Sequence, residues 1–126
     1  MVYRNAGQPE EAVRSFERAI RLSPVDPTLH IAFAGMGLAL IELGRFDEAI
    51  AAGKKAQRQN PSHSATYRCL ASAFAHLGRD AEAREAAARA VEIDPAFTIS
   101  AWIAGSRLPI NAKLMIEGFR KAGLPE

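Results

Sequence analysis

The sequence predicts an all-α protein: a right-handed α-α superhelix of about three and a half helical repeats with a C-terminal closing helix. Two observations predict this fold. One set of turn, helix-start and helix-stop residues recurs along the chain at a nearly constant spacing. The chain is also rich in alanine, which favours helix, and its β-branched residues are scattered. A helical unit copied at a fixed spacing is typical of a solenoid, in which each unit packs against its neighbours.

The recurring residues are a glycine, a glutamate followed by alanine, a later alanine and a proline. They occur as Gly7, Glu11, Ala12, Ala19 and Pro24, then 37 residues later as Gly44, Glu48, Ala49, Ala56 and Pro61, and 34 residues after that as Gly78, Glu82, Ala83, Ala90 and Pro95. These landmarks divide one domain into a truncated first repeat (1–26), a second repeat (27–61), a third repeat (62–95), and a half repeat with the closing helix (96–126).

The first predicted helix runs from Pro9 to about Leu22. Pro9 suits the first helical position, and Pro24 disfavours helical geometry in the residue before it. Its apolar residues step by three and four positions and share one face: Ala12, Val13, Phe16, Ala19 and Ile20. The preceding segment Met1–Ala6 is too short to form a stable helix alone, so this face lacks the cover that a complete repeat would supply.

The next helices are bounded by the same kinds of residue, glycine, proline and polar capping residues. The sequence predicts helices from about Pro27 or Thr28 to Leu43, from Phe46 to Arg58, from a cap at Ser62 or Ser64 to Leu77, and from Asp80 to Ile93. The second of the five helices is apolar on most sides, which predicts burial on two faces. At Gly53 we expect Met36 or Tyr67 to fill the space that a side chain would occupy.

The C-terminal part departs from this pattern. A helix from Phe97 to Leu108 aligns with the first helices of the earlier repeats, and Pro109 ends it early. Asn111 is a good cap for a closing helix that ends at Gly123. We expect the apolar face of that helix to pack near Ala101, Ala104 and Leu108. That face consists of Leu114, Met115, Gly118, Phe119 and Ala122.

The residues that recur at equivalent positions of these repeats resemble the tetratricopeptide repeat, a pair of helices that ends at a proline. The matching positions are the small residues Gly37, Ala71, Ala49 and Ala83, the large residues Phe33, Met36, Leu40, Tyr67, Leu70 and Phe74, and Ala56, Ala90, Pro61 and Pro95. The resemblance implies a protein–protein interaction scaffold or adaptor that binds a peptide or helix of its partner in a concave groove. The residues themselves show no pattern of catalytic, cofactor or metal chemistry, so we expect no enzyme activity, no catalytic residue and no cofactor or metal site.

The first helices of such repeats line the groove. In this frame the candidate partner-binding residues are Ile31, Ala34, Leu38, Ile41, Arg68, Ser72, His76, Trp102 and Ser106. Family members that grip peptide C-termini use a lysine-and-asparagine carboxylate clamp, and Ala34 and Leu38 occupy the matching places, so that clamp is absent. The alternative is that the closing helix simply covers this apolar surface.

Two other functions stay open. The ending from Gly118 to Glu126 resembles the C-terminus of bacterial signalling proteins that join a nucleotide cyclase or DNA-binding domain to these repeats. It implies a regulatory segment of a larger protein. The third candidate is a self-associating structural protein, a homodimer that pairs through the N-terminal helix at Val13, Phe16 and Ile20.

Composition and charge exclude two classes of partner. The net charge of +2 is small and the acidic and basic residues are interspersed along the chain, so we expect no nucleic-acid partner. The most apolar run, Ile31–Ile41, is shorter than the roughly 20 residues of a membrane span, so we expect no membrane partner.

Cys69 is the single cysteine, which makes a cytoplasmic location the expectation. Its sequence neighbour Arg68 points elsewhere on a helix, so a nucleophilic role is disfavoured. The three histidines lack ligand spacing and favour structural or surface roles.

Overall fold

The computed structural model describes residues 9–105 and 112–126, and all regular structure within these ranges is helical. The helices are α1 (Pro9–Leu22), α2 (Leu29–Glu42), α3 (Phe46–Gln59), α4 (Ser64–His76), α5 (Asp80–Ile93), α6 (Ile99–Gly105) and α7 (Lys113–Ala122). The predicted roles of Met1–Ala6, Ser106, Leu108, Pro109 and Asn111 fall on residues outside these ranges.

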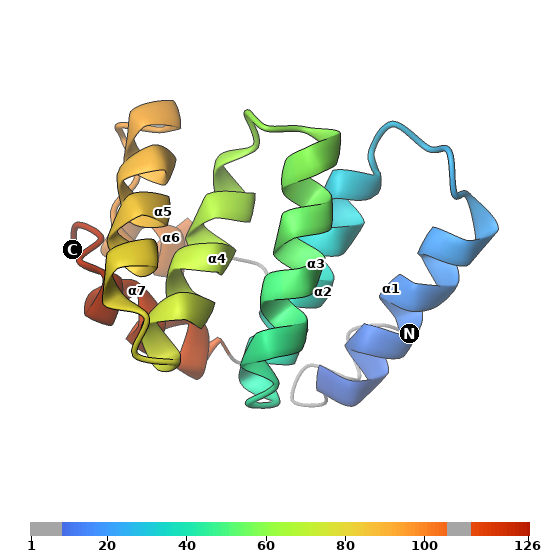
Figure 1. Cartoon of the computed structure of the whole chain (residues 1–126), viewed down its shortest axis with the longest axis horizontal. Helices are drawn as coiled ribbons and strands as arrows, with labels where there is room; N and C mark the ends of the chain where they lie inside the picture. Colours follow the sequence, from blue (N-terminus) through green and yellow to red (C-terminus); the bar gives the residue numbers. More distant parts are fainter. Residues whose placement is uncertain (1–8, 106–111) are drawn as a thin grey trace.

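The helices α1, α3, α4 and α5 stand in a row across the view, and α2 lies behind α3 (Figure 1). Each helix from α1 to α5 contacts the next one along the chain. The pairs α2–α3 and α4–α5 make the most extensive contacts, and α4 also packs against α3 and α2. This is a helical repeat solenoid, so the predicted fold class is confirmed. Helices α6 and α7 lie at the end of the row opposite α1 (Figure 1).

Two glycines make the turns inside the helix pairs. Gly44 and Gly78 both have φ of 75°, a left-handed conformation that glycine adopts without steric cost. The residue after each glycine donates its N–H back into the preceding helix, Arg45 to the carbonyl of Leu40 and Arg79 to that of Phe74. The predicted turn glycines therefore reverse the chain at equivalent places in two repeats.

The helix starts differ from the predicted caps. Residue His63 precedes α4 and makes no side-chain capping bond, so neither Ser62 nor Ser64 acts as the predicted cap. The side-chain oxygen of Asn60 instead accepts the N–H of Ser62 and orders this turn. Its neighbour Pro61 accepts a hydrogen bond from the hydroxyl of Tyr67 at 2.7 Å, which ties the turn to α4.

Small residues allow the repeats to approach closely. A Cβ added at Gly37 of α2 would lie 2.5 Å from Sγ of Cys69, closer than such atoms ever come. At Gly53 of α3 the added atom would lie 2.7 Å from Cδ2 of Leu70. The neighbour that fills the space at Gly53 is therefore Leu70, and the prediction of Met36 or Tyr67 is wrong. The cause is that α4 packs against α3 and turns Leu70, in its second turn, toward this position.

The C-terminal helices differ most from the prediction. Only Ile99 of α6 is buried, and α6 makes no extensive contact with any other described helix. Helix α7 packs against α4, α2 and α5, so the predicted packing of α7 on Ala101 and Ala104 is wrong. The end of the chain connects the two helices instead: Ile99 donates its N–H to Pro125 at 2.8 Å, and Ser100 donates to Glu126 at 2.8 Å.

Candidate partner-binding groove

Helices α2 and α4 lie side by side and turn one shared face toward α6 and α7; we call it the groove face. Its uncovered part is a hollow of about 220 Å³, the open groove. The residues that line the open groove are Ile31, Ala34, Gly35, Leu38, His63, Ala65, Arg68, Trp102 and Met115. Most of these side chains are apolar, so this hollow suits an apolar side chain of a partner.

The structure divides the nine predicted groove residues into three sets. Five line the open groove: Ile31, Ala34, Leu38, Arg68 and Trp102. Ser72 and His76 lie on the groove face but contact α7. Ile41 is fully buried inside the core and cannot meet a partner, so its placement in the groove is wrong. Ser106 lies outside the described residues.

Ile31 is the most exposed apolar side chain of the open groove, at 54% of its full accessible area. Ala34 and Leu38 form its floor and are 8% and 6% exposed. Gly35 also lines the hollow, and the ring of Phe16 from α1 packs on it: an added Cβ would lie 2.6 Å from Cζ of Phe16. A partner would therefore meet a shallow apolar surface with Ile31 at its edge.

Arg68 supplies a positive charge to the wall of the open groove. Its guanidinium stacks on the ring of Phe97 at 4.6 Å and lies 3.7 Å from Asp94. Burial lowers the pKa of the Arg68 guanidinium, and the nearby Asp94 carboxylate offsets part of that effect. The side chain is only 12% exposed, so it is held in place before any partner arrives.

Two histidines meet at one end of the open groove, which spacing along single helices did not predict. The rings of His30 and His63 lie 4.7 Å apart in an edge-to-face arrangement. Nδ1 of His63 pairs with the hydroxyl of Thr66 at 3.0 Å, and Nε2 of His30 pairs with the side-chain amide of Asn60 at 3.2 Å. Burial, followed by the charges of His30 and Arg68, lowers the pKa of His63. Its neutral form therefore faces the open groove at pH 7.

Helix α7 covers the rest of the groove face through bonds to its backbone. The Glu42 carboxylate accepts the N–H groups of Leu114 at 3.3 Å and Met115 at 2.7 Å. The Ser72 hydroxyl donates to the carbonyl of Met115 at 3.1 Å, and Nε2 of His76 donates to that of Leu114 at 2.7 Å. Glu42 thus caps the first turn of α7 from a distant helix.

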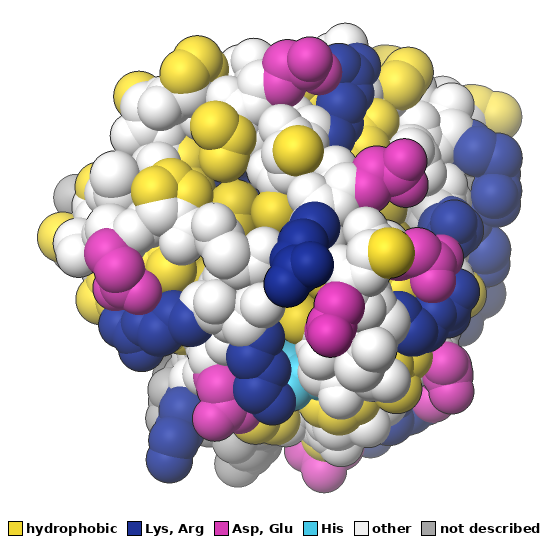
Figure 2. All heavy atoms as spheres, turned by 60° about the vertical axis from the view of Figure 1, so that its left-hand side comes forward, with side chains coloured by type: hydrophobic (Ala, Val, Ile, Leu, Met, Phe, Trp, Pro, Cys, Tyr) yellow, Lys and Arg dark blue, Asp and Glu magenta, His cyan; other side chains and the backbone are white. Residues whose placement is uncertain are grey.

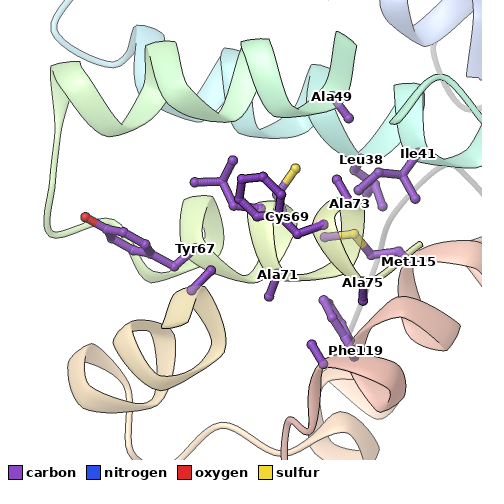
Figure 3. Close-up of a cluster of buried hydrophobic side chains, with 14 of the residues drawn as sticks. Leu38, Ile41, Ala49, Tyr67, Cys69, Ala71, Ala73, Ala75, Met115 and Phe119 are labelled. Carbon is purple, nitrogen blue, oxygen red and sulfur yellow. The ribbon is translucent and has the colours of Figure 1, made fainter. Parts of the chain in front are cut away.

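Apolar side chains complete this contact. Phe119 is fully buried, with its ring edge-to-face to Trp102 at 5.1 Å and to Phe97 at 5.7 Å. Met115 is 5% exposed, and Figure 3 draws both side chains among the buried residues of α4. At Gly118 an added Cβ would lie 2.0 Å from Oγ of Ser72, so only glycine permits this approach.

The sequence pointed to α7 as a cover but missed the residues that hold it. Glu42 ends α2 and has no capping pattern of its own, because the helix it caps begins about seventy residues later. Gly118 was assigned only to an apolar face. Its contact with Ser72 could be predicted only by knowing which helix lies opposite.

A larger hollow of about 380 Å³ lies on the other side of α4, between α3 and α5. Charged side chains of both signs surround it, including Lys54, Glu82 and Arg89. A similar hollow of about 190 Å³ lies one repeat earlier, between α1 and α3, lined by Arg45, Glu48 and Lys55. Because this feature recurs with the repeat, we assign it to the repeat architecture and not to a specific site.

The three predicted self-association residues pack onto the neighbouring helix. Val13 is 6% exposed, while Phe16 and Ile20 are half-buried, and α1 contacts α2. The expected exposed strip on α1 is therefore wrong for Val13. Among the described residues at this end, the most exposed apolar ones are Leu22, at 76%, and Val25, at 91%, which lie in and after the last turn of α1.

Other residues considered for chemistry have structural surroundings. Cys69 is buried, and desolvation raises its pKa to about 12, so its thiol stays protonated at neutral pH. In residues 9–105 and 112–126, no three His, Cys, Asp or Glu side chains come together as metal ligands would. No helix within these ranges has the length and apolar character needed to cross a membrane. On the face in Figure 2, basic and acidic side chains intersperse, as the charge pattern predicts.

Comparison with known proteins agrees with the repeat. A family model described as tetratricopeptide repeat matches residues 1–62 and again residues 34–96. Among curated proteins, the chain is 33% identical over 84 residues to small glutamine-rich tetratricopeptide repeat-containing protein 2 of Mycosarcoma maydis. It is 34% identical over 84 residues to the STIP1 homolog of Dictyostelium discoideum, and 31% identical over 91 residues to the Hsp70-Hsp90 organizing protein of Triticum aestivum.

These alignments cover most of this chain and a small part of each relative. They include 67%, 67% and 72% of this chain, but only 23%, 14% and 15% of the three relatives. The similarity therefore concerns the repeats and not the remainder of those proteins. With the helix pairs, their turn glycines and the two overlapping matches of the family model, the chain belongs to the tetratricopeptide repeat family.

Proposed function

We propose that this chain is an adaptor that binds an apolar segment of a partner protein in the open groove. The observation that carries this proposal is the exposure of Ile31, at 54%, above a floor of buried apolar residues. Arg68 and His63 stand at the polar side of the hollow, so a partner residue next to the apolar anchor would carry a hydrogen-bond acceptor.

The repeats of the relatives support a protein-binding role for this chain. The name of one relative, the Hsp70-Hsp90 organizing protein, describes organisation of other proteins. The apolar residues Ala34 and Leu38 at the floor of the open groove favour a partner anchored by apolar contact instead of a terminal carboxylate. We also propose a cytoplasmic setting, because the single cysteine is buried as a thiol.

The test is selection of a displayed library of random 15-residue peptides against the full chain, followed by affinity measurements on variants. Ile31→Glu should weaken the selected peptides at least about 10-fold, since it removes an apolar contact worth about 1.4 kcal/mol or more. The matched control is Leu77→Glu, which changes another exposed apolar residue, at 38%, that does not line the groove. Equal losses for both variants, or none for Ile31→Glu, would contradict the proposal.

A second candidate function is self-association through α1. The exposed side chains of Leu22 and Val25 extend the apolar residues Phe16 and Ile20 toward the α1–α2 turn, which favours a contact between two copies. Sedimentation equilibrium should then detect a dimer that Leu22→Glu converts to monomer. A wild-type chain that stays monomeric at high concentration would refute this candidate.

The resemblance of residues 118–126 to bacterial signalling proteins supports a further proposal, a regulatory segment of a larger protein. In that setting the groove would bind another part of the same protein. An upstream reading frame continuous with Met1 would favour this proposal, and a stop codon in frame directly upstream would oppose it.

A further inference from the structure

The polar bonds between α7 and the groove face all reach its backbone. All four bonds from Glu42, Ser72 and His76 reach main-chain N–H or carbonyl groups of Leu114 and Met115. Backbone groups are the same in every helix, so these three side chains would accept the first turn of any helix that arrives in this orientation. What selects a particular helix must come from elsewhere in the contact.

That selection comes from shape. Gly118 lies against Ser72 so closely that an added Cβ would be 2.0 Å from its Oγ and 2.8 Å from its Cα. The next residue, Phe119, fills the space between Trp102 and Phe97. A helix that fits the groove face therefore needs a small residue followed directly by an aromatic residue, about one turn after its capped start.

We propose that α7 is an intramolecular ligand of the groove face, and that a partner binds there by replacing it with a helix of the same pattern. Such a helix starts over Glu42, places a large apolar residue where Met115 lies, and has glycine then an aromatic residue where Gly118 and Phe119 lie. The inference rests on the proposed function, because it takes the groove face as the binding surface. It adds the class of partner and the element that regulates access.

The contacts of α7 within the chain support an exchangeable helix. Helix α7 packs on α4, α2 and α5, and it meets α6, its neighbour in sequence, chiefly where the ring of Phe119 lies against Trp102. Its cap comes from α2, through the half-buried carboxylate of Glu42. The repeat core of α2 to α5 has its own pairwise contacts between successive helices.

A tethered ligand lowers the apparent affinity of any competing helix, because only the fraction of molecules with a free groove face can bind. Tethering also gives α7 an effective concentration near the millimolar range. Weakening α7 without changing the groove face should therefore increase binding in trans.

The experiment uses a labelled synthetic peptide of residues 112–126 with the full chain and two single variants. Gly118→Ala introduces the clash with Ser72 into α7 only, and alanine raises helix propensity, so any loss of docking is steric. The matched control is Gly105→Ala in α6, where an added Cβ meets nothing within 4 Å. Fluorescence of Trp102, the only tryptophan, reports whether Phe119 has left its ring.

We expect the peptide to bind the Gly118→Ala chain at least about 10-fold more tightly than the wild type or the Gly105→Ala chain. The fluorescence of Trp102 should change in the Gly118→Ala chain and revert when the peptide is added. Equal affinity for the three chains would overturn the proposal. So would a Gly118→Ala chain that loses its overall helical circular dichroism, because α7 would then be inseparable from the repeats.

These outcomes are independent of the peptide selection against the open groove. If displayed peptides bind at Ile31 but residues 112–126 do not exchange, the proposed function stands and only the intramolecular ligand is refuted. If residues 112–126 exchange but no displayed peptide depends on Ile31, the binding site is the surface under α7.

Discussion

The second and third repeats and the C-terminal segment are built in different ways. In α2 to α5 each position has an equivalent one repeat away: Gly44 with Gly78, and the ion pair Arg45–Glu48 with Arg79–Glu82, both at 2.6 Å. In α6 and α7 the deciding contacts have no such equivalent, because Glu42 and Ser72 bond to α7 alone. The comparison teaches that the inner repeats of a solenoid use the same contacts again in each repeat. The end of the solenoid is instead covered through contacts that occur only there.

The largest expected loss of stability concerns the C-terminal end of the solenoid, where α7 packs. Phe119→Ala should cost about 3–5 kcal/mol, because the ring is fully buried between Trp102 and Phe97. Urea unfolding followed by Trp102 fluorescence should shift more than unfolding followed by circular dichroism, which reports all helices. The control is Ile103→Ala on the exposed side of α6, at 46% exposure, which should stay within about 0.5 kcal/mol. Equal shifts of both probes would show that the two regions unfold together.

A smaller effect is expected inside the repeats. Gly53→Phe should destabilise by about 1–3 kcal/mol through overpacking, because the added side chain meets Leu70. Both optical probes should report the same loss, since this contact joins α3 to α4. A rise in melting temperature would refute the close packing at Gly53.

The smallest effect is a pH dependence at Glu42. Burial raises the pKa of Glu42, and the hydrogen bonds from Met115 and Leu114 and the charge of His76 oppose that rise. A raised carboxyl pKa means that the folded state holds the proton more firmly than the unfolded state. The cost of burying the charge is therefore present above the folded pKa and is relieved as pH falls through it.

The measurement compares the wild type with Glu42→Gln, which removes the charge and keeps an acceptor. As pH falls from 7 toward the raised pKa, the melting temperature of the wild type should increase relative to that of Glu42→Gln. The comparison cancels the titration of all other carboxyl groups. A relative decrease on acidification would show that the hydrogen bonds to α7 outweigh the cost of burial.

Sequence reasoning predicted the repeat core well because its signals are local. Proline and glycine positions predicted the bounds of α5 and placed α1, α2, α3 and α4 to within about two residues. The half repeat was harder: the prediction had a helix from Phe97, while α6 begins at Ile99 and buries only that residue fully. Alignment of this segment with the first helices of earlier repeats shows which residues are similar. It does not show whether a neighbouring helix is present to pack on those residues.

The candidate site was predicted in part for the same reason. The prediction that the first helices of the repeats line the groove correctly placed three residues in the open groove: Ile31, Arg68 and Trp102. Ile41 lies on a neighbouring face of α2 and is completely buried in the core. The roles of Ser72 and His76 depend on α7, whose position is set by contacts between residues about forty positions apart.

Native-state hydrogen exchange on the wild-type chain tests most directly whether α7 is a separable occupant of the groove face. The amides of α7 from Gly118 to Ala122 should exchange at least about 10-fold faster than those of α4 from Leu70 to Phe74, through an opening that leaves the repeats folded. Their exchange should also depend less on denaturant, since undocking exposes less surface than global unfolding. Identical rates and identical denaturant dependence for α7 and α4 would contradict this account, because α7 would then leave the groove face only when the whole chain unfolds.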